Sequence, residues 1–295
     1  MKHTTLYFYL LLLLCLPIWS VAQQLNSKTD SLINKNSKET SYGSVSTYYN
    51  SDIVFLGRKS SIQAPYFSTM VGYYHKSGVY ANFGVSYLAS SAQKRIDLSA
   101  FTVGYNHSEN SFSAGVSATK YFFNKNSYTI ESALSTTING YIDYDFDILD
   151  ARIDANGYFG TTTDFISSIS LNKPFYINDF TILPSVTMNI GTQNYFGNYS
   201  NNYKFMGGTS GGMGGGGMGG GNPTSSMMGG SSIPLKTLDY EASITCSYSF
   251  NNFRLYFIPS YAIPLNAALI TNGTTTYTEN ISNSFYWSVG INYIF

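Results

Sequence analysis

The sequence predicts an all-β fold, a transmembrane antiparallel up-and-down β-barrel of about 12 strands. Charged residues make up only 11% of the chain, while aromatic residues reach 17%. Segments of about ten residues alternate between apolar and polar side chains, which is the period of a strand with two different faces. Beyond the first residues there is no run of about 20 apolar residues, so membrane-spanning helices are not expected.

The segment 284–295 shows the alternation most clearly. One parity is apolar and consists of Phe285, Trp287, Val289, Ile291, Tyr293 and Phe295. The other parity is mostly small or polar and consists of Ser284, Tyr286, Ser288, Gly290 and Asn292. An outer face that meets lipid and an inner face that meets water would produce this pattern.

Ten further segments repeat the pattern in chain order. They are Tyr66–Tyr74, Val79–Leu88, Ile96–Asn106, Ser111–Phe122, Tyr128–Tyr144, Leu149–Gly160, Phe165–Lys173, Phe180–Thr192, Leu238–Phe250 and Phe253–Pro264. A weaker segment at 43–56 brings the total to twelve, which we prefer because closed bacterial barrels nearly always have even strand numbers, with ten as the alternative. The parity changes near Ala100, which predicts a bulge. Pro259 removes a ladder donor and predicts a weak point.

The beginning of the chain predicts a secretory signal. Lys2 is followed by an apolar run, Leu6–Leu16, and by the small-x-small sequence Ser20-Val21-Ala22, so we expect cleavage between Ala22 and Gln23. The expected organisation is a signal peptide at 1–22, a polar periplasmic leader at 23–42 and a barrel at 43–295. Cleavage leaves Cys246 without a cysteine partner, so no disulfide or cysteine metal cluster is predicted.

The lengths of the connections predict an orientation. If Phe295 lies at the periplasmic end, the short turns near Ser77, Ser108, Asp145, Asn178 and Asn251 are periplasmic. The connections at 90–95, 192–236 and 265–282 then face outward, and two of them are long. Short periplasmic turns with longer outer loops are typical of such barrels.

Taken together, these features resemble a small outer-membrane β-barrel protein of Gram-negative type. The resemblance rests on Ser20-Val21-Ala22, on the alternating strands and on the closing residues Val289, Ile291, Tyr293 and Phe295. The closing residues are similar to the C-terminal signal by which a barrel-assembly machine recognises its clients. The resemblance implies a bacterial outer membrane with both termini periplasmic, contact with its lipids, and periplasmic chaperones and that machine as partners. It is a resemblance of class and implies no substrate.

Charged residues on inward parities are the first candidate functional feature. They are Glu131, Asp143, Asp150, Arg152, Asp154, Asp239, Glu241 and Arg254. We expect one group around Arg152 and a second formed by Asp239, Glu241 and Arg254. These charges would act either as a selectivity filter of a pore or as ion pairs that rigidify a closed lumen, and the sequence leaves both open.

Other motifs predict no chemistry. The Gly/Met-rich segment at about 195–236 is expected to be a flexible outer loop, although methionine thioethers are ligands for soft metals. His75 and His107 fall beside turns expected to be periplasmic, so they are not placed to activate a serine at the outer rim. No catalytic, cofactor or metal site is predicted, and no basic surface for nucleic acid is present.

The sequence therefore supports three functional hypotheses. The first is a non-enzymatic barrel, either a narrow pore or a structural surface barrel. The second is a barrel subunit of a larger outer-membrane complex with other proteins as partners. The third and least favoured is a lipid-modifying enzyme.

Deletion of 207–230 tests the loop hypothesis. We expect the shortened protein to fold and to keep its heat-modifiable mobility on gels, because glycine-rich sequence contributes little to a packed structure. Loss of that mobility would show that the segment is part of the barrel.

Overall fold

The computed structural model describes residues 40–59, 64–90, 94–125, 127, 134–160, 162–194, 235–272 and 275–295. The expected signal peptide, the leader up to residue 39, Glu131 and residues 195–234 of the Gly/Met-rich segment lie outside these ranges. The expectations for them stay predictions.

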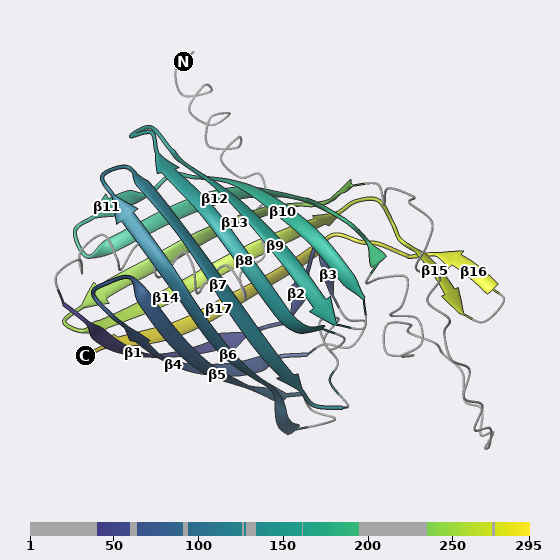
Figure 1. Cartoon of the computed structure of the whole chain (residues 1–295), viewed down its shortest axis with the longest axis horizontal. Helices are drawn as coiled ribbons and strands as arrows, with labels where there is room; N and C mark the ends of the chain where they lie inside the picture. The colour runs from purple at the N-terminus through teal and green to yellow at the C-terminus, as the bar shows by residue number, and fades with distance from the viewer. Residues whose placement is uncertain are drawn as a thin grey trace, which may run out of the picture.

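Long antiparallel strands follow one another around a closed wall (Figure 1). The wall strands are β1 (Tyr42–Asn50), β4 (Tyr66–Tyr74), β5 (Val79–Ala89), β6 (Lys94–Glu109), β7 (Phe112–Phe123), β8 (Leu134–Asp145), β9 (Asp150–Gly160), β10 (Thr163–Asn172), β11 (Phe175–Ile177), β12 (Phe180–Gly191), β13 (Lys236–Phe250), β14 (Phe253–Pro264) and β17 (Ser284–Ile294). Two small hairpins are separate from it: β2 (Val54–Phe55) with β3 (Arg58–Lys59), and β15 (Leu269–Asn272) with β16 (Thr275–Thr278).

The wall has twelve strand positions. β10 and β11 pair with successive stretches of the same neighbour, β12, so together they form one wall strand. The 13 strands of the sheet therefore fill twelve positions around the barrel. β1 closes the ring against β17, and the backbone amide of Gly43 donates to the carbonyl of Phe295 at 2.8 Å. The prediction of about 12 antiparallel strands is confirmed, and the alternative of ten is wrong.

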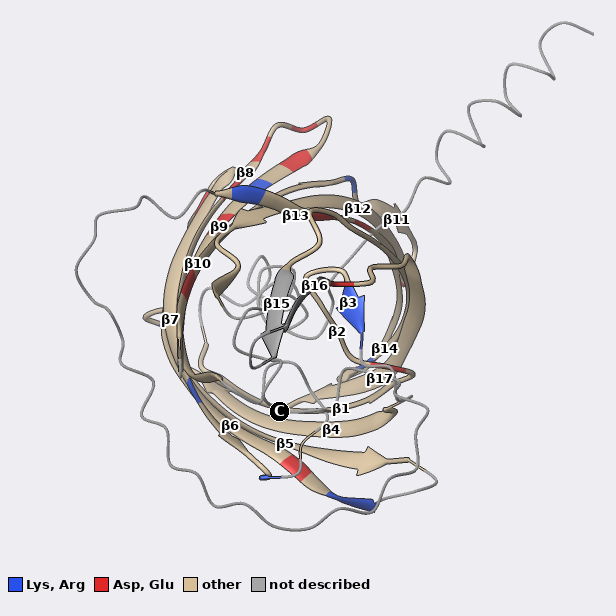
Figure 2. Ribbon diagram, turned by 90° about the vertical axis from the view of Figure 1, so that its right-hand side faces the viewer, with Lys and Arg blue, Asp and Glu red and all other residues tan. Residues whose placement is uncertain are grey.

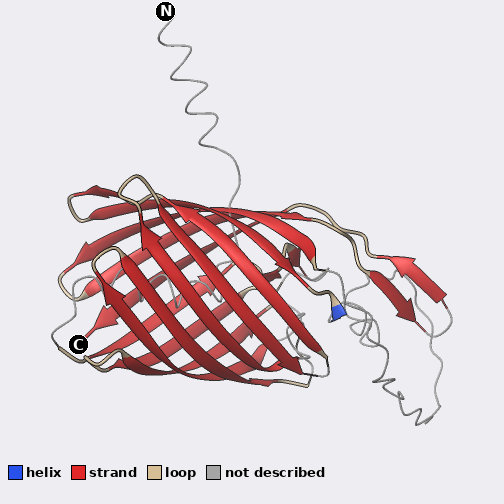
Figure 3. Ribbon diagram, turned by 45° about the horizontal axis from the view of Figure 1, so that its top comes forward, coloured by secondary structure: helices blue, strands red, loops and turns tan. Residues whose placement is uncertain are grey.

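The side chains alternate as the sequence predicts. On β10, Ile169 and Leu171 are exposed on the outside, whereas Ser168 and Ser170 are buried inside. The other wall strands likewise expose apolar side chains outward, among them Phe83, Phe101, Val116, Ile138, Ile153, Val186 and Phe257. The strands are tilted across the wall (Figure 3). An apolar outer band around a polar interior is the arrangement of a transmembrane barrel.

The two ends of the barrel differ. We call the end that holds Tyr42 and Ile294 the terminus end and the opposite end the loop end. Four turns at the terminus end each contain an Asn or Asp with positive φ: Asn110, Asp147, Asn178 and Asn251. These residue types tolerate the left-handed conformation of tight turns, so the sequence signals for these turns are local.

Two strand predictions need correction or refinement. The first strand does not run to Leu56: β1 ends at Asn50, and residues 54–55 belong to β2. The bulge lies at Asp97, three residues before Ala100, because Ser86 pairs with Leu98 and Tyr87 with Ile96. The extra residue turns its carboxylate inward, where it accepts a hydrogen bond of 2.5 Å from the Tyr66 hydroxyl.

The remaining strand boundaries agree within a few residues. The strand expected at Tyr128–Tyr144 is described from Leu134, and 128–133 lie outside the described ranges. The predicted weak point at Pro259 is confirmed, since the pairing of β13 with β14 is interrupted between Ser243–Ser260 and Cys246–Phe257. In the described part of the chain, no helix is long and apolar enough to span a membrane.

Charge substitutions at two isoleucines test the lipid-facing band. Ile138 lies outward in the middle of β8, whereas Ile148 lies in the turn after β8. We expect Ile138→Lys to lower the free energy of unfolding by about 2–4 kcal/mol and Ile148→Lys by about 0–1 kcal/mol, because the cost of a charge depends on its depth in the bilayer. Denaturant titration in lipid vesicles measures both. Equal small effects would contradict a bilayer around β8.

Candidate functional site

An inward-folded hairpin occupies part of the lumen at the loop end. Between β1 and β4 the chain turns into the barrel, and β2 and β3 lie inside the ring of strands (Figure 2). Phe55 and Leu56 pack in a buried cluster with wall residues that include Leu134, Tyr158 and Leu238. Val54 packs on the other side of the lumen, in a cluster that contains Tyr256, Ile258, Ala262 and Tyr286.

Arg58 anchors this hairpin. Its side chain is buried, and its Nε lies 3.0 Å from both carboxylate oxygens of Glu279. Its two terminal nitrogens donate to carbonyls of Leu56 (2.8 Å), Leu265 (3.1 Å), Leu238 (3.4 Å) and Asn266 (3.4 Å). Charge-assisted bonds to several acceptors are what a buried guanidinium needs to offset its desolvation. Arg58 therefore ties the hairpin to the start of β13 and to the connection that precedes β17.

The tip of the hairpin touches the wall. Gly57 has a φ of 78°, and a Cβ atom there would lie 2.9 Å from Cβ of Asp239 and from Cα of Pro264. Both the backbone conformation and the space favour glycine at this position. The hairpin therefore rests directly against β13 and β14.

A second ionic contact lies at the base of the hairpin. Asp52 is 3.8 Å from Nζ of Lys59, and its carboxylate accepts bonds from the backbone amides of Ile53 (3.1 Å) and Ala64 (3.5 Å). Burial raises the pKa of the Asp52 carboxyl above its ordinary value, while the charge of Lys59 acts in the opposite direction. The two ends of the inward segment are thus held together by Asp52.

The structure brings the first predicted charge group together. Arg152 lies on the inner face of β9 and forms two bonds with Asp154, of 2.9 and 2.8 Å. Its guanidinium carbon is 3.8 Å from the centre of the Tyr141 ring. Asp143 pairs in register with Arg152, and Asp150 lies at the start of the same strand. This group runs along the wall as an ion pair flanked by further carboxylates.

The structure separates the second predicted group. Asp239 and Glu241 are fully buried on the inner face near the loop end, whereas Arg254 pairs with Ser249 at the terminus end and donates to its hydroxyl at 3.0 Å. The separation of eight residue positions from Glu241 to Ser249 corresponds to about 27 Å along a strand. Arg58, which the sequence did not single out, interacts electrostatically with Asp239 instead. The one available signal was the run Ile53-Val54-Phe55-Leu56, which breaks the alternation just before Gly57.

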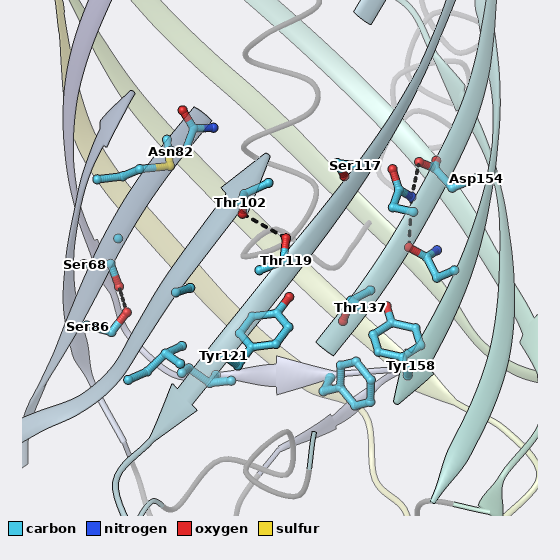
Figure 4. A pocket seen from close by; sticks show the side chains of 18 of the residues that line it. Ser68, Asn82, Ser86, Thr102, Ser117, Thr119, Tyr121, Thr137, Asp154 and Tyr158 are labelled. Carbon is cyan, nitrogen blue, oxygen red and sulfur yellow. Dashed lines mark hydrogen bonds between the residues drawn. The ribbon is translucent and has the colours of Figure 1, made fainter. Parts of the chain in front are cut away.

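A cavity of about 270 Å³ lies between the hairpin and the wall formed by β1, β4–β10 and β12, and both apolar and polar side chains line it. Hydroxyl groups of neighbouring strands are paired along its wall, with 2.8 Å between Ser68 and Ser86 and 2.8 Å between Thr102 and Thr119 (Figure 4). Its amides include Asn139, which donates to Asn156 at 2.9 Å. Ser117, Thr137, Ser168 and Asn189 also line it.

Tyrosine rings keep this cavity hollow by lying flat along the wall. The ring of Tyr80 covers Gly104, where a Cβ would meet it at 2.5 Å, and the ring of Tyr141 covers Gly115, where a Cβ would meet it at 2.4 Å. An aromatic ring placed over a glycine of the neighbouring strand is a known device for barrel walls. The sequence shows these glycines and tyrosines on inward parities but not which of them pair.

Two other predicted features have defined positions. Val289, Ile291, Tyr293 and Phe295 are exposed on the outer side of β17 and at its end, and their recognition by an assembly machine stays a prediction. His75 and His107 lie at the terminus end, where Nδ1 of His75 is 2.8 Å from the Ser77 hydroxyl within the turn. Within the described ranges, no group of three His, Cys, Asp or Glu side chains could hold a metal ion.

No family model and no curated protein matches the chain. Among solved structures, the chain is similar to the KdgM porin, with 9% identity, a TM-score of 0.47, and 85% of this chain and 98% of that chain covered. The NanC porin gives 14% identity, a TM-score of 0.46 and coverage of 85% and 98%. The COG4313 outer membrane channel from Pseudomonas putida F1 gives 10% identity, a TM-score of 0.44 and coverage of 86% and 95%.

TM-scores below 0.5 support no conclusion about function, so the class of this protein follows from its own structure. A closed antiparallel wall, an apolar outer band and a polar lumen define a 12-stranded β-barrel of the outer-membrane type.

Alanine at two glycines tests how the hairpin is seated. Gly57→Ala should dislodge the hairpin tip from Asp239 and Pro264, whereas Gly84→Ala, on the inner face of β5, meets no atom closer than 3.8 Å. We expect trypsin to cut after Lys59 at least several-fold faster in refolded Gly57→Ala than in the wild type, because protease attack follows local opening. Gly84→Ala should match the wild type. Equal cleavage in all three proteins would show that the tip contact does not hold the hairpin in place.

Proposed function

We propose that this protein is a narrow outer-membrane pore for small polar solutes, constricted at the loop end by the β2–β3 hairpin. The observation that carries the proposal is the cavity inside the barrel, whose lining includes hydroxyl and amide side chains from β4–β10 and β12 beside apolar side chains. A structural barrel has no need of such a hollow interior, and its side chains would be expected to fill it.

The strand number supports a pore of restricted width. Barrels of about 8 strands are filled by their own side chains, and barrels of about 16 strands leave a water channel. A 12-stranded wall lies between these limits, so a segment folded into it narrows the passage substantially. Arg58 holds this segment in place through Glu279 and four backbone carbonyls.

The inner charges support a preference for cations. Carboxylates at inward positions of the described wall are Asp97, Asp143, Asp145, Asp150, Asp154, Asp164, Asp239 and Glu241. The described cationic side chains on the inner wall and the hairpin are fewer: Arg58, Lys59, Arg95, Arg152 and Arg254. Some of these charges form ion pairs along the wall, but negative charge remains in excess. A surplus of carboxylates in a confined aqueous space attracts cations.

The proposal includes the orientation expected from the sequence. The terminus end would face the periplasm and the loop end the exterior, after removal of 1–22 and insertion by the barrel-assembly machine. The short turns at the terminus end and the long connection between β12 and β13 support this orientation.

Removal of the hairpin tests the pore directly. Asn50 and Tyr66 are paired neighbours on β1 and β4, so residues 51–65 can be replaced by a two-residue Asn-Gly turn that suits adjacent antiparallel strands. In planar bilayers we expect discrete, cation-preferring current steps, at least about twofold larger in this variant than in the wild type because the constriction is gone.

The control is a variant with the same turn sequence placed between β7 and β8, which leaves the hairpin intact. Heat-modifiable mobility of each protein verifies folding. Silence of both wild type and hairpin-less protein would contradict the pore and favour a structural barrel or a subunit of a larger complex.

A further inference from the structure

We propose that the cavity beneath the hairpin is a binding site for a small uncharged solute with one apolar face and several hydroxyl groups, such as a free monosaccharide. A role of this site in transport rests on the proposed pore. Binding itself can be measured even in a protein that conducts no ions. It follows from four properties of the cavity: an apolar side, a hydroxylated side, buried polar atoms without partners, and neutralised charge.

The hairpin supplies the apolar side. Ile53, Val54, Phe55 and Leu56 all line the cavity, and we call them the apolar shelf. The Phe55 ring meets the Tyr158 ring edge-on, with 5.6 Å between their centres. A solute ring with C–H groups on one face can pack on such a surface.

The opposite wall supplies hydrogen-bonding groups. In the pairs Ser68–Ser86 and Thr102–Thr119, one hydroxyl donates to the other. Each pair still retains one O–H donor and several lone pairs. These groups line the cavity (Figure 4). A solute that carries several hydroxyls matches this mixture of donors and acceptors.

Buried polar atoms in the lining point to a ligand more specifically. Among the described residues, three that line the cavity each have one polar atom without a hydrogen-bond partner: Oδ1 of Asn82, Oγ1 of Thr137 and Nδ2 of Asn189. Their relative exposures are 4%, 6% and 1%. Buried polar groups in folded proteins are almost always satisfied, and a turn of these side chains toward the cavity would let a bound solute that both donates and accepts supply the missing partners.

The charge around the cavity favours an uncharged solute. Among the described side chains that line it, Asp154 carries the charge, and it is neutralised by the two bonds from Arg152. An anionic solute would find no free cation there and would face the surplus carboxylates of the lumen. The cavity volume, about 270 Å³, is at the small end for ligand pockets, which suits one sugar ring better than a chain.

Calorimetric titration of the refolded full-length protein in detergent micelles tests the site. The probes are D-glucose, the acyclic polyol mannitol, and D-glucuronate as the anionic analogue. We expect glucose to bind at least tenfold more tightly than either of the others. The double variant Asn82→Leu/Thr137→Val, which keeps side-chain size, should weaken glucose binding at least tenfold.

Thr187→Val is the matched control. Thr187 is buried on the inner face and bonded to Ser170, but it lies outside the cavity lining, so this variant should bind glucose like the wild type. Equal affinity for glucuronate, unchanged binding by the double variant, or no glucose binding would each overturn the site.

Conductance separates this proposal from the pore. Ion current without glucose binding or glucose-dependent block would overturn the site and leave the pore in place. Glucose binding that weakens in the double variant, in a protein that conducts no ions, would support the site and overturn the pore.

Discussion

Closure of the backbone hydrogen-bond ladder is the constraint on which the rest of this structure depends. In lipid, an unpaired amide or carbonyl has no water to bind, so a spanning sheet has to be closed. The pairing of β1 with β17 and the mutual bonds of Gly43 and Phe295 complete the ring. Once the ring is closed, each residue of a strand faces either lipid or lumen, and the period-two pattern becomes obligatory.

Closure also creates the interior that the proposed pore requires. A ring of this size has more inner space than its small inward side chains fill, and the chain uses that space in two ways. At the loop end the segment between β1 and β4 folds inward and is held by Arg58 and Glu279. Below it, tyrosines lie flat over glycines and leave a cavity lined by both apolar and polar side chains. The same inner face thus carries both a constriction and a potential binding surface.

The sequence predicted the wall well because the wall depends on local patterns. The alternation set the strand boundaries within a few residues, and Asn and Asp marked the tight turns. The alternation does not show which side chains meet where their contact depends on pairing between distant parts of the chain. Parity places Arg254, Asp239 and Glu241 on the same side of the sheet, but parity does not give the position along the strand. Arg254 lies next to the turn at Asn251, whereas Asp239 and Glu241 lie at the other end of β13. Arg58 was missed because its partners Glu279 and Leu238 are about two hundred residues away in the chain.

In the proposed pore, the hairpin links the width of the lumen to the chemistry of the cavity. Its tip rests on β13 and β14 at Gly57, while its apolar shelf faces the cavity. A displacement of the hairpin would therefore widen the lumen and remove the apolar side of the cavity at the same time. Occupancy of the cavity would favour the seated hairpin, since a ligand stabilises the state that it contacts. Solute binding is thus expected to lower ion conduction, and the two are coupled through the contacts of the β2–β3 segment.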